Sequence, residues 1–305
     1  MSFRHALDSA FEKGKAKLNE FQANNNRPPV PARPHSNQPP PVPTSSKPGS
    51  SAPAAAYWQP NLNASRAVTE DFRHELGDHG WGNNESQNYT NNPANSFYTP
   101  DGKLVVRAIA DSNQQQRYTS ARLTSHQTLS RPRGFLSVSI QAPCASGIWP
   151  AFWLLPADPF VWPTDGEVDI FESWNGDLVN HSCLHWGFFN GEDWNKHRVV
   201  ETHVPSMPHS VHNFGFAWNQ DTGKLLWYID GAPVMKANIP PGTRPMADFR
   251  LIINVAMGGN VCGGKLPDNG HYDLVLSDLK MVESPAGGWD RFEQEWNQAQ
   301  EGKAG

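Results

Sequence analysis

The sequence predicts an all-β fold, a single β-sandwich or barrel, from Trp58 onward. Short runs of β-branched, aromatic and alternating residues are separated by Gly, Pro, Asn and Asp. No long stretch has helical periodicity, and no internal repeat is present. Because this pattern continues over about 230 residues, one sandwich or barrel accounts for all of them.

The predicted strands share alternation or a continuous apolar run bounded by turn residues. The clearest cover residues 103–110, 134–143, 167–174, 213–219, 224–231, 249–259 and 272–282. Tight-turn signals lie between them, at Pro100-Asp101-Gly102, Asp221-Thr222-Gly223 and Asp230-Gly231. Two twisted antiparallel sheets of this size can present one concave face to a long ligand.

Residues 1–55 differ from the rest in composition. They contain 10 of the 27 prolines and none of the tryptophans or tyrosines, and they carry a net charge of +4 against −9 for the remainder. Such a segment buries too little apolar surface to offset the entropy of ordering, so we predict a largely disordered arm. Apolar residues at roughly helical spacing over residues 2–22 indicate either a short amphipathic helix that meets a partner or membrane surface, or a frayed helix, which Gly14 favours.

The second half of the arm, residues 27–48, is typical of a polyproline II linker. Within it Pro28, Pro31 and Arg33 match PxxPxR, the pattern that aromatic-lined SH3 grooves accept. An SH3-type partner at Pro28–Arg33 is one interpretation, and a chance match in proline-rich sequence is the other.

Charge and hydropathy exclude several classes. The net charge of −5 argues against a nucleic-acid-binding protein, and no run approaches the roughly 18 apolar residues of a membrane span. Residues 1–26 carry charges every few positions, so no secretory signal is expected, and the location stays open between the cytoplasm and export by another route. Three cysteines, Cys144, Cys183 and Cys262, lack the number for a disulfide framework and the spacing for a structural zinc site.

Three acids lie in one predicted strand, in the segment DGEVDIFES. Alternate side chains of a strand share a face, so Glu167 and Asp169 point the same way. Glu172 is five residues from Glu167, so a β-bulge near Ile170 and Phe171 is needed to return it to that face. Mutual repulsion would raise at least one pKa and create an acid beside an ionised partner, as a retaining glycosidase requires. A solvated acidic strand edge and a calcium site are the alternatives.

Seven strings in and around this strand form a pattern. They are WGNNESQNYT (81–90), DGKL (101–104), YTSARL (118–123), GIWPAFWLLP (147–156), WPTDGEVDIFESWNG (162–176), HSCLHWG (181–187) and LIINVAMGG (251–259). In this order they resemble glycoside hydrolase family 16, and within it the laminarinase-like endo-β-1,3-glucanases. The resemblance implies a concanavalin A-like β-jelly-roll of two curved antiparallel sheets, with the active cleft across the concave one.

By position, the resemblance implies that Glu167 is the nucleophile and Glu172 the general acid/base. Asp169 would lie between them, orient the nucleophile and tune the protonation of the pair. The E-x-D-x-x-E spacing is similar to the family's bulged form.

The resemblance also implies five substrate-binding residues: Trp149, Trp153, His185, Asn83 and Arg122. The two tryptophans would line the cleft beside the scissile bond, and His185 would lie near the acids. A core role for His185 stays open, as do structural roles at strand ends for Asn83 and Arg122.

The chain departs from the family after the double glycine, where a Trp-Pro-Gly loop is usual. It has Asn260-Val261-Cys262-Gly263-Gly264 instead, so one aromatic sugar platform is missing or supplied elsewhere. Some members bind calcium on the convex side, where Asp278 is similar to a late-strand acid. We therefore expect no required cofactor and no metal in the active site, and a structural calcium is left open.

The sequence thus predicts three parts: the arm over residues 1–55, a catalytic domain over residues 56–285 and a C-terminal tail over residues 286–305. The expected function is that of a monomeric, retaining endo-β-glucanase whose substrate is a β-1,3 or mixed β-1,3/1,4-glucan. A non-catalytic β-glucan-binding protein and a glucan transglycosylase are the alternatives, because one fold hosts all three.

Overall fold

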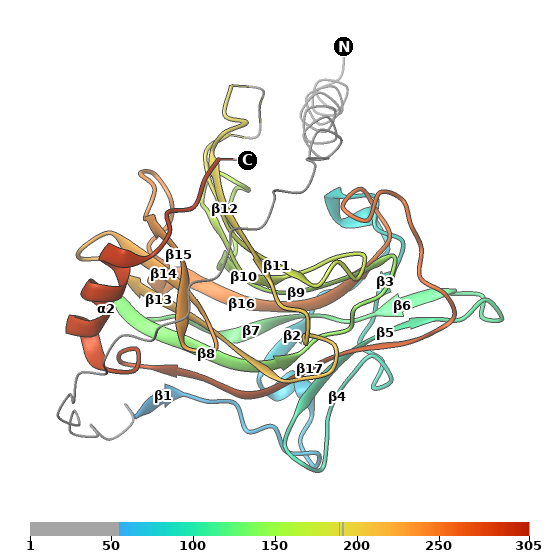
Figure 1. Ribbon diagram of the computed structural model, residues 1–305. Coiled ribbons are helices and arrows are strands. Elements are labelled where there is room, and N and C mark those ends of the chain that lie inside the picture. Colours follow the sequence, from blue (N-terminus) through green and yellow to red (C-terminus); the bar gives the residue numbers. More distant parts are fainter. Residues whose placement is uncertain (1–54, 189, 191, 305) are drawn as a thin grey trace, which may run out of the picture.

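A computed structural model of the protein consists of two β-sheets stacked face to face, which confirms the all-β prediction (Figure 1). It describes residues 55–188, 190 and 192–304. The predicted helix over residues 2–22 and the SH3 motif at Pro28–Arg33 lie outside the described residues. In the described part, no helix has both the length and the apolar character needed to cross a membrane.

The larger sheet has ten strands in the order β15-β14-β13-β8-β17-β5-β6-β3, with β1 added to β17 and β4 added to β5. Its pairs are antiparallel except for β3 with β6. Its strands are β1 (Ala56–Trp58), β3 (Asn88–Tyr89), β4 (Ser96–Tyr98), β5 (Leu104–Ala110), β6 (Tyr118–Ser120), β8 (Arg133–Gln141), β13 (His212–Asn219), β14 (Lys224–Ile229), β15 (Ala232–Asn238) and β17 (Gly270–Val282).

The smaller sheet has seven strands in the order β12-β11-β10-β9-β16-β7-β2. They are β2 (Phe72–His74), β7 (Arg122–Thr128), β9 (Ile148–Pro156), β10 (Glu167–Glu172), β11 (Val179–His185), β12 (His197–His203) and β16 (Phe249–Met257). Helices among the described residues are the 3₁₀ turns η1 (Val68–Glu70), η2 (Gly80–Gly82) and η3 (Met246–Asp248), and α2 (Gly288–Gln298).

The seven strand runs expected from the sequence all form strands, and their turns are as predicted. Asp230-Gly231 alone joins β14 to β15, with φ angles of 51° and 77°. Positive φ at both positions is the type I′ geometry that matches the twist of a hairpin, and Asp-Gly is a preferred sequence for it.

The hydrophobic core lies between the two sheets and holds the acid-bearing strand β10 in position. Val168 and Phe171 of β10 point into this core and are fully buried. Trp227 of β14, in the other sheet, donates its indole N–H to the backbone oxygen of Asp169 at 2.8 Å. The strand is therefore tied to the opposite sheet at the residue between the two glutamates.

Residues 286–305, predicted as a tail, contain helix α2 beside β13–β15 (Figure 1). Phe292 on this helix is fully buried. It belongs to a second hydrophobic cluster on the outer face of the ten-stranded sheet, with Ala217, Leu226 and Tyr228. This segment therefore packs on the sandwich.

After α2, the chain joins one edge of each sheet. Lys303 pairs with Val199 of β12, and Glu301 pairs with Lys236 of β15. Gly302 lies between them, where a Cβ atom would be 2.8 Å from side-chain atoms of Arg198 and Met235. Only glycine allows so close an approach.

Candidate active site

The three acids lie on β10, between β9 and β11 in the smaller sheet. Asp169 pairs with Trp153 of β9 and Phe171 pairs with Phe152, so Ile170 is an extra residue at the register shift. The shift is where the sequence predicts a bulge. It returns Glu172 to the outer face that Glu167 and Asp169 share.

Each glutamate accepts one hydrogen bond from an indole N–H. Trp149 of β9 donates to Oε1 of Glu172 at 2.8 Å, and Trp162 donates to Oε2 of Glu167 at 2.6 Å. Trp162 lies in the loop between β9 and β10, and the residue is 45% exposed. The sequence analysis did not select it, although it opens the string that contains Glu167.

His185 of β11 lies beside the acids, as the sequence predicts. Its Nε2 is 3.4 Å from Oδ2 of Asp169 and 4.0 Å from Oε1 of Glu167. Burial alone would lower the pKa of His185, but Asp169 and the two glutamates together outweigh burial and raise the pKa to about 9. A positive charge at His185 therefore offsets part of the repulsion among the carboxylates.

Burial and neighbouring charge raise the pKa values of both glutamates. Desolvation is the larger cause and the charge of Asp169 is the second, so the pKa of Glu167 rises to about 7 and that of Glu172 to about 8. The indole donors and His185 oppose the rise. Burial and the neighbouring charge therefore favour a proton on this pair of glutamates near neutral pH.

One group of three side chains here offers ligand atoms for a metal ion. Atoms of Asp169, Cys183 and His185 lie within 4.8 Å of one another. Asp169 and His185 already form an ion pair at this place. The three cysteines are free thiols.

Arg122 of β7 lies between two aromatic rings, and the sugar contact predicted for it stays a prediction. Its guanidinium carbon is 4.7 Å from the centre of the Trp153 ring and 4.8 Å from that of Trp81. Its Nε is 3.7 Å from Oε2 of Glu75. Trp81 and Glu75 were not predicted as site residues.

Asn83 lies at the end of η2. Its backbone N–H donates to Gly80 and its backbone oxygen accepts from Asn260. These backbone contacts fit the structural alternative for Asn83, and its sugar contact stays a prediction.

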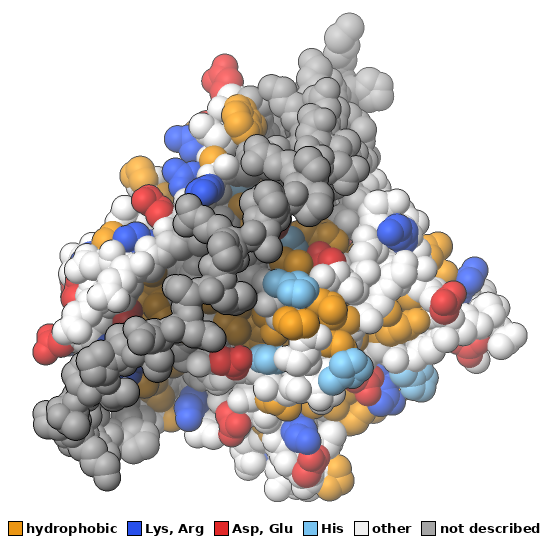
Figure 2. Space-filling model, viewed as in Figure 1, with side chains coloured by type: hydrophobic (Ala, Val, Ile, Leu, Met, Phe, Trp, Pro, Cys, Tyr) orange, Lys and Arg blue, Asp and Glu red, His pale blue; other side chains and the backbone are white. Residues whose placement is uncertain are grey.

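The loop after β16 differs from the usual family sequence at residues 260–264. It forms one wall of a cavity of roughly 360 Å³. The cavity is lined by Asn84, Ser86, Gly259, Asn260, Gly263, Gly264 and Leu266. No aromatic side chain is among these lining residues. Figure 2 shows histidine and hydrophobic side chains gathered in the middle of the face that it presents.

Comparisons with known proteins point to one family. Residues 82–213 match a family model described as "XgeA-like, catalytic GH16 domain". A β-glucanase of Rhodothermus marinus is 30% identical over 205 residues, which cover 62% of this chain and 70% of that protein. The glucan endo-1,3-β-glucosidase A1 of Niallia circulans is 30% identical over 245 residues, which are 69% of this chain and 35% of that longer protein.

A solved structure shows the same architecture. The laminarinase from Rhodothermus marinus superposes with a TM-score of 0.64 at 26% identity, and the match covers 75% of this chain and 97% of that one. The likeness confirms the predicted jelly-roll sandwich.

Proposed function

The chain belongs to glycoside hydrolase family 16, and we propose that it is a retaining endo-β-glucanase acting on β-1,3 or mixed β-1,3/1,4-glucan. The observation that carries the proposal is the placement of Glu167 and Glu172 on one face, around the register shift at Ile170, with Asp169 between them. The names of the similar proteins, glucanases and laminarinases, support the choice of substrate.

In the first step, an oxygen of Glu167 attacks the anomeric carbon of the sugar. Glu172 gives its proton to the glycosidic oxygen as the bond to that oxygen breaks, and a covalent glycosyl-enzyme forms. In the second step, Glu172 takes a proton from water, the water oxygen attacks the same carbon, and Glu167 leaves as a carboxylate. Two inversions give net retention.

The environment of the two glutamates suits these roles. Trp162 occupies Oε2 of Glu167, which leaves Oε1 for the attack. Burial raises the pKa of Glu172, as a general acid near neutral pH requires. The charge of Asp169 raises the pKa of both glutamates and so favours a proton on the pair.

These features favour an enzyme over a glucan-binding protein. A lectin would gain nothing from two desolvated glutamates next to a buried aspartate, because such a cluster costs folding free energy. Transfer to another sugar would use the same glycosyl-enzyme, with a sugar hydroxyl in place of water.

The test is incubation of the full chain with laminarin, lichenan, agarose and carrageenan, with products resolved by size. We expect short oligosaccharides from laminarin or lichenan, released first as the β-anomer in proton NMR. Glu172→Gln should lose this activity, and Glu201→Gln, whose side chain is 68% exposed on β12, should keep it.

Three outcomes would contradict the proposal. An α-anomer released first would show inversion, and binding to laminarin without products would indicate a recognition protein. Products longer than the substrate would indicate transglycosylation.

Further expectations for this chain also remain proposals. They are a monomeric state, a structural calcium near Asp278, and an SH3-type partner at Pro28–Arg33. Asp278 lies at a register shift in β17, on the sheet opposite the acids, and accepts a hydrogen bond from Ser139.

A further inference from the structure

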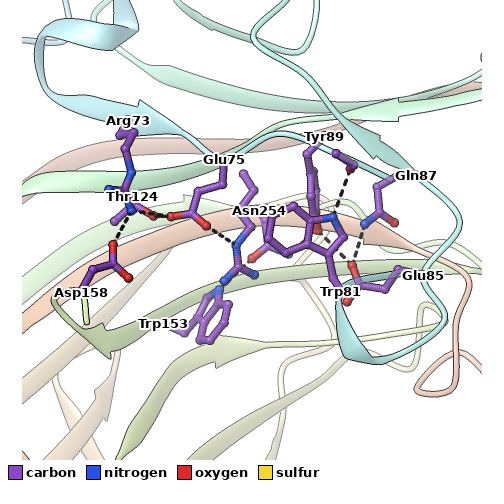
Figure 3. Close-up of polar contacts among 12 residues, drawn as sticks. Arg73, Glu75, Trp81, Glu85, Gln87, Tyr89, Thr124, Trp153, Asp158 and Asn254 are labelled. Atoms are coloured by element: carbon purple, nitrogen blue, oxygen red, sulfur yellow. Dashed lines mark hydrogen bonds and ion pairs between the residues drawn. The ribbon is translucent and has the colours of Figure 1, made fainter. Parts of the chain in front are cut away.

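A chain of side-chain hydrogen bonds runs from Trp153 to Glu85 (Figure 3). Nε1 of Trp153 donates to Oδ1 of Asn254 at 2.7 Å, and Nδ2 of Asn254 donates to the hydroxyl of Tyr89 at 3.0 Å. The Tyr89 hydroxyl donates to Oε2 of Glu85 at 3.3 Å, the longest of the three bonds. Because Tyr89 lies in β3 and Asn254 in β16, the chain of bonds links the two sheets.

The chemistry of the first donor fixes the direction of every bond. An indole N–H can only donate, so Asn254 has to turn its oxygen toward Trp153 and its NH₂ group toward Tyr89. The Tyr89 oxygen then accepts, and its proton needs a separate acceptor, which is Glu85.

Gln87 donates a second hydrogen bond to the same carboxylate oxygen of Glu85. Oε1 of Gln87 accepts the backbone N–H of Met257 at 2.7 Å, so its Nε2 has to face Oε2 of Glu85, at 2.6 Å. Two donors thus converge on one carboxylate oxygen. Gln87 and Tyr89 are 0% and 1% exposed, so no bulk water can replace this acceptor.

Loss of the Glu85 carboxylate would reverse the donor and acceptor roles along this series of hydrogen bonds. The Tyr89 hydroxyl would then donate to the oxygen of Asn254, and the NH₂ group of Asn254 would turn to the indole N–H. Two donors would face each other there, which a buried site does not tolerate, so the Trp153 ring would move.

We propose that Glu85 is a positioning residue, which sets the orientation of the Asn254 amide and through it the ring of Trp153 in the cleft. Trp153 pairs with Asp169 on the neighbouring strand, so its ring lies beside the acids. Arg122 fixes one face of the ring, and the hydrogen-bond chain fixes its N–H edge. The ligand concerned is the sugar unit next to the scissile bond, and this kinetic part rests on the proposed function.

The test is a double-mutant cycle. Glu85→Leu removes the acceptor at similar volume and should raise KM for laminarin roughly tenfold, with a smaller change in kcat. Glu85→Gln keeps one acceptor oxygen and should stay close to the wild type. In Tyr89→Phe the Asn254 oxygen still faces the indole N–H, so KM should stay nearer the wild type than in Glu85→Leu. Adding Tyr89→Phe to Glu85→Leu removes the hydroxyl that would reverse the chain, so it should bring KM back toward the wild-type value.

The cycle distinguishes positioning from a general structural effect. In a Trp153→Phe background, Glu85→Leu should cause no further rise in KM, because the N–H that it orients is gone. In a Trp149→Phe background, used as the matched control, the tenfold rise should persist. Equal rises in both backgrounds would overturn the proposal.

The positioning role of Glu85 can also be tested without substrate, and so independently of the proposed glucanase activity. In a spectrum of ¹⁵N-labelled indole groups, the Trp153 signal is identified by its loss in Trp153→Phe. It should move in Glu85→Leu and stay in place in Glu85→Gln. An unmoved signal in Glu85→Leu would overturn the positioning role, whatever the enzyme cleaves.

Discussion

Nε1 of Trp149 lies 2.8 Å from Oε1 of Glu172, and this is a charge-assisted bond whenever Glu172 is ionised. Trp149→Phe removes the donor and keeps the ring. Because the bond favours the carboxylate, its loss should raise the pKa of Glu172 further, so the alkaline limb of kcat/KM should move up by about one pH unit. Trp153→Phe is the control, since its N–H contacts Asn254. An unmoved alkaline limb would contradict the acid/base role.

Trp162→Phe should shift the acidic limb of the pH profile of kcat/KM. Trp162 donates to Glu167, which has to be ionised to attack, so loss of the bond should raise the pKa of Glu167. The acidic limb of kcat/KM should therefore move to higher pH, by about one unit, and the bell should become narrower. In Trp149→Phe the bell should become wider. A shift of the same limb in both variants would show that the two glutamates do not have separate roles.

The sequence predicted the acid strand well because its pattern is local. The five-residue spacing from Glu167 to Glu172 required one extra residue, and the structure places it at Ile170. The neighbouring strand β9 was less evident, because prolines at 150 and 156 argue against a central strand. The carbonyl of Pro150 accepts the backbone N–H of Ser173, which lies just beyond the end of β10. The N–H and C=O of one residue in an antiparallel strand face the same neighbour, so the N–H that proline lacks would also face this position. Pro150 is tolerated because β10 has already ended there and no bond of the sheet is lost.

Residues that act through tertiary contacts could not be predicted in the same way. Tyr89 and Gln87 were visible within a recognised string, but their partners Asn254 and Met257 lie more than 160 positions away. The sequence predicts only a tail over residues 286–305, and α2 forms within it. Phe292 gains its packing only from the sheet beneath it.

Arg122→Lys should weaken substrate binding. Lysine keeps the positive charge near Glu75 but cannot stack a flat group between Trp81 and Trp153. We expect KM for laminarin to rise about fivefold, with less change in kcat. Arg73→Lys is the control. Arg73 is half exposed and also pairs with Glu75, and its replacement should leave KM unchanged. An unchanged KM in Arg122→Lys would show that the stacking does not shape the cleft.

Phe292→Ala tests whether α2 belongs to the folded unit. The ring is fully buried against Ala217, Leu226 and Tyr228, so its loss should cost about 3 kcal/mol of unfolding free energy. For a domain of this size the melting temperature should fall by about 6–12 °C. Gln294→Ala, at an exposed position on the same helix, is the control. A melting temperature equal to that of the control would mean that the sandwich is stable without this contact.

Glu172→Gln should make the protein more stable while it loses activity. The pKa of Glu172 rises from 4.5 to about 8 in the folded chain, so folding retains a proton that the unfolded chain has lost. The wild type therefore loses stability as the pH rises from 4.5 toward 8, and glutamine, which has no proton to lose, avoids this. At pH 8 the melting temperature of Glu172→Gln should exceed that of the wild type by about 3–8 °C, and near pH 4 the two should coincide. Glu201→Gln, at an exposed position of the same sheet, should match the wild type at both pH values. A difference of the same size at pH 4 and pH 8 would show that packing, and not the buried charge, separates the two proteins.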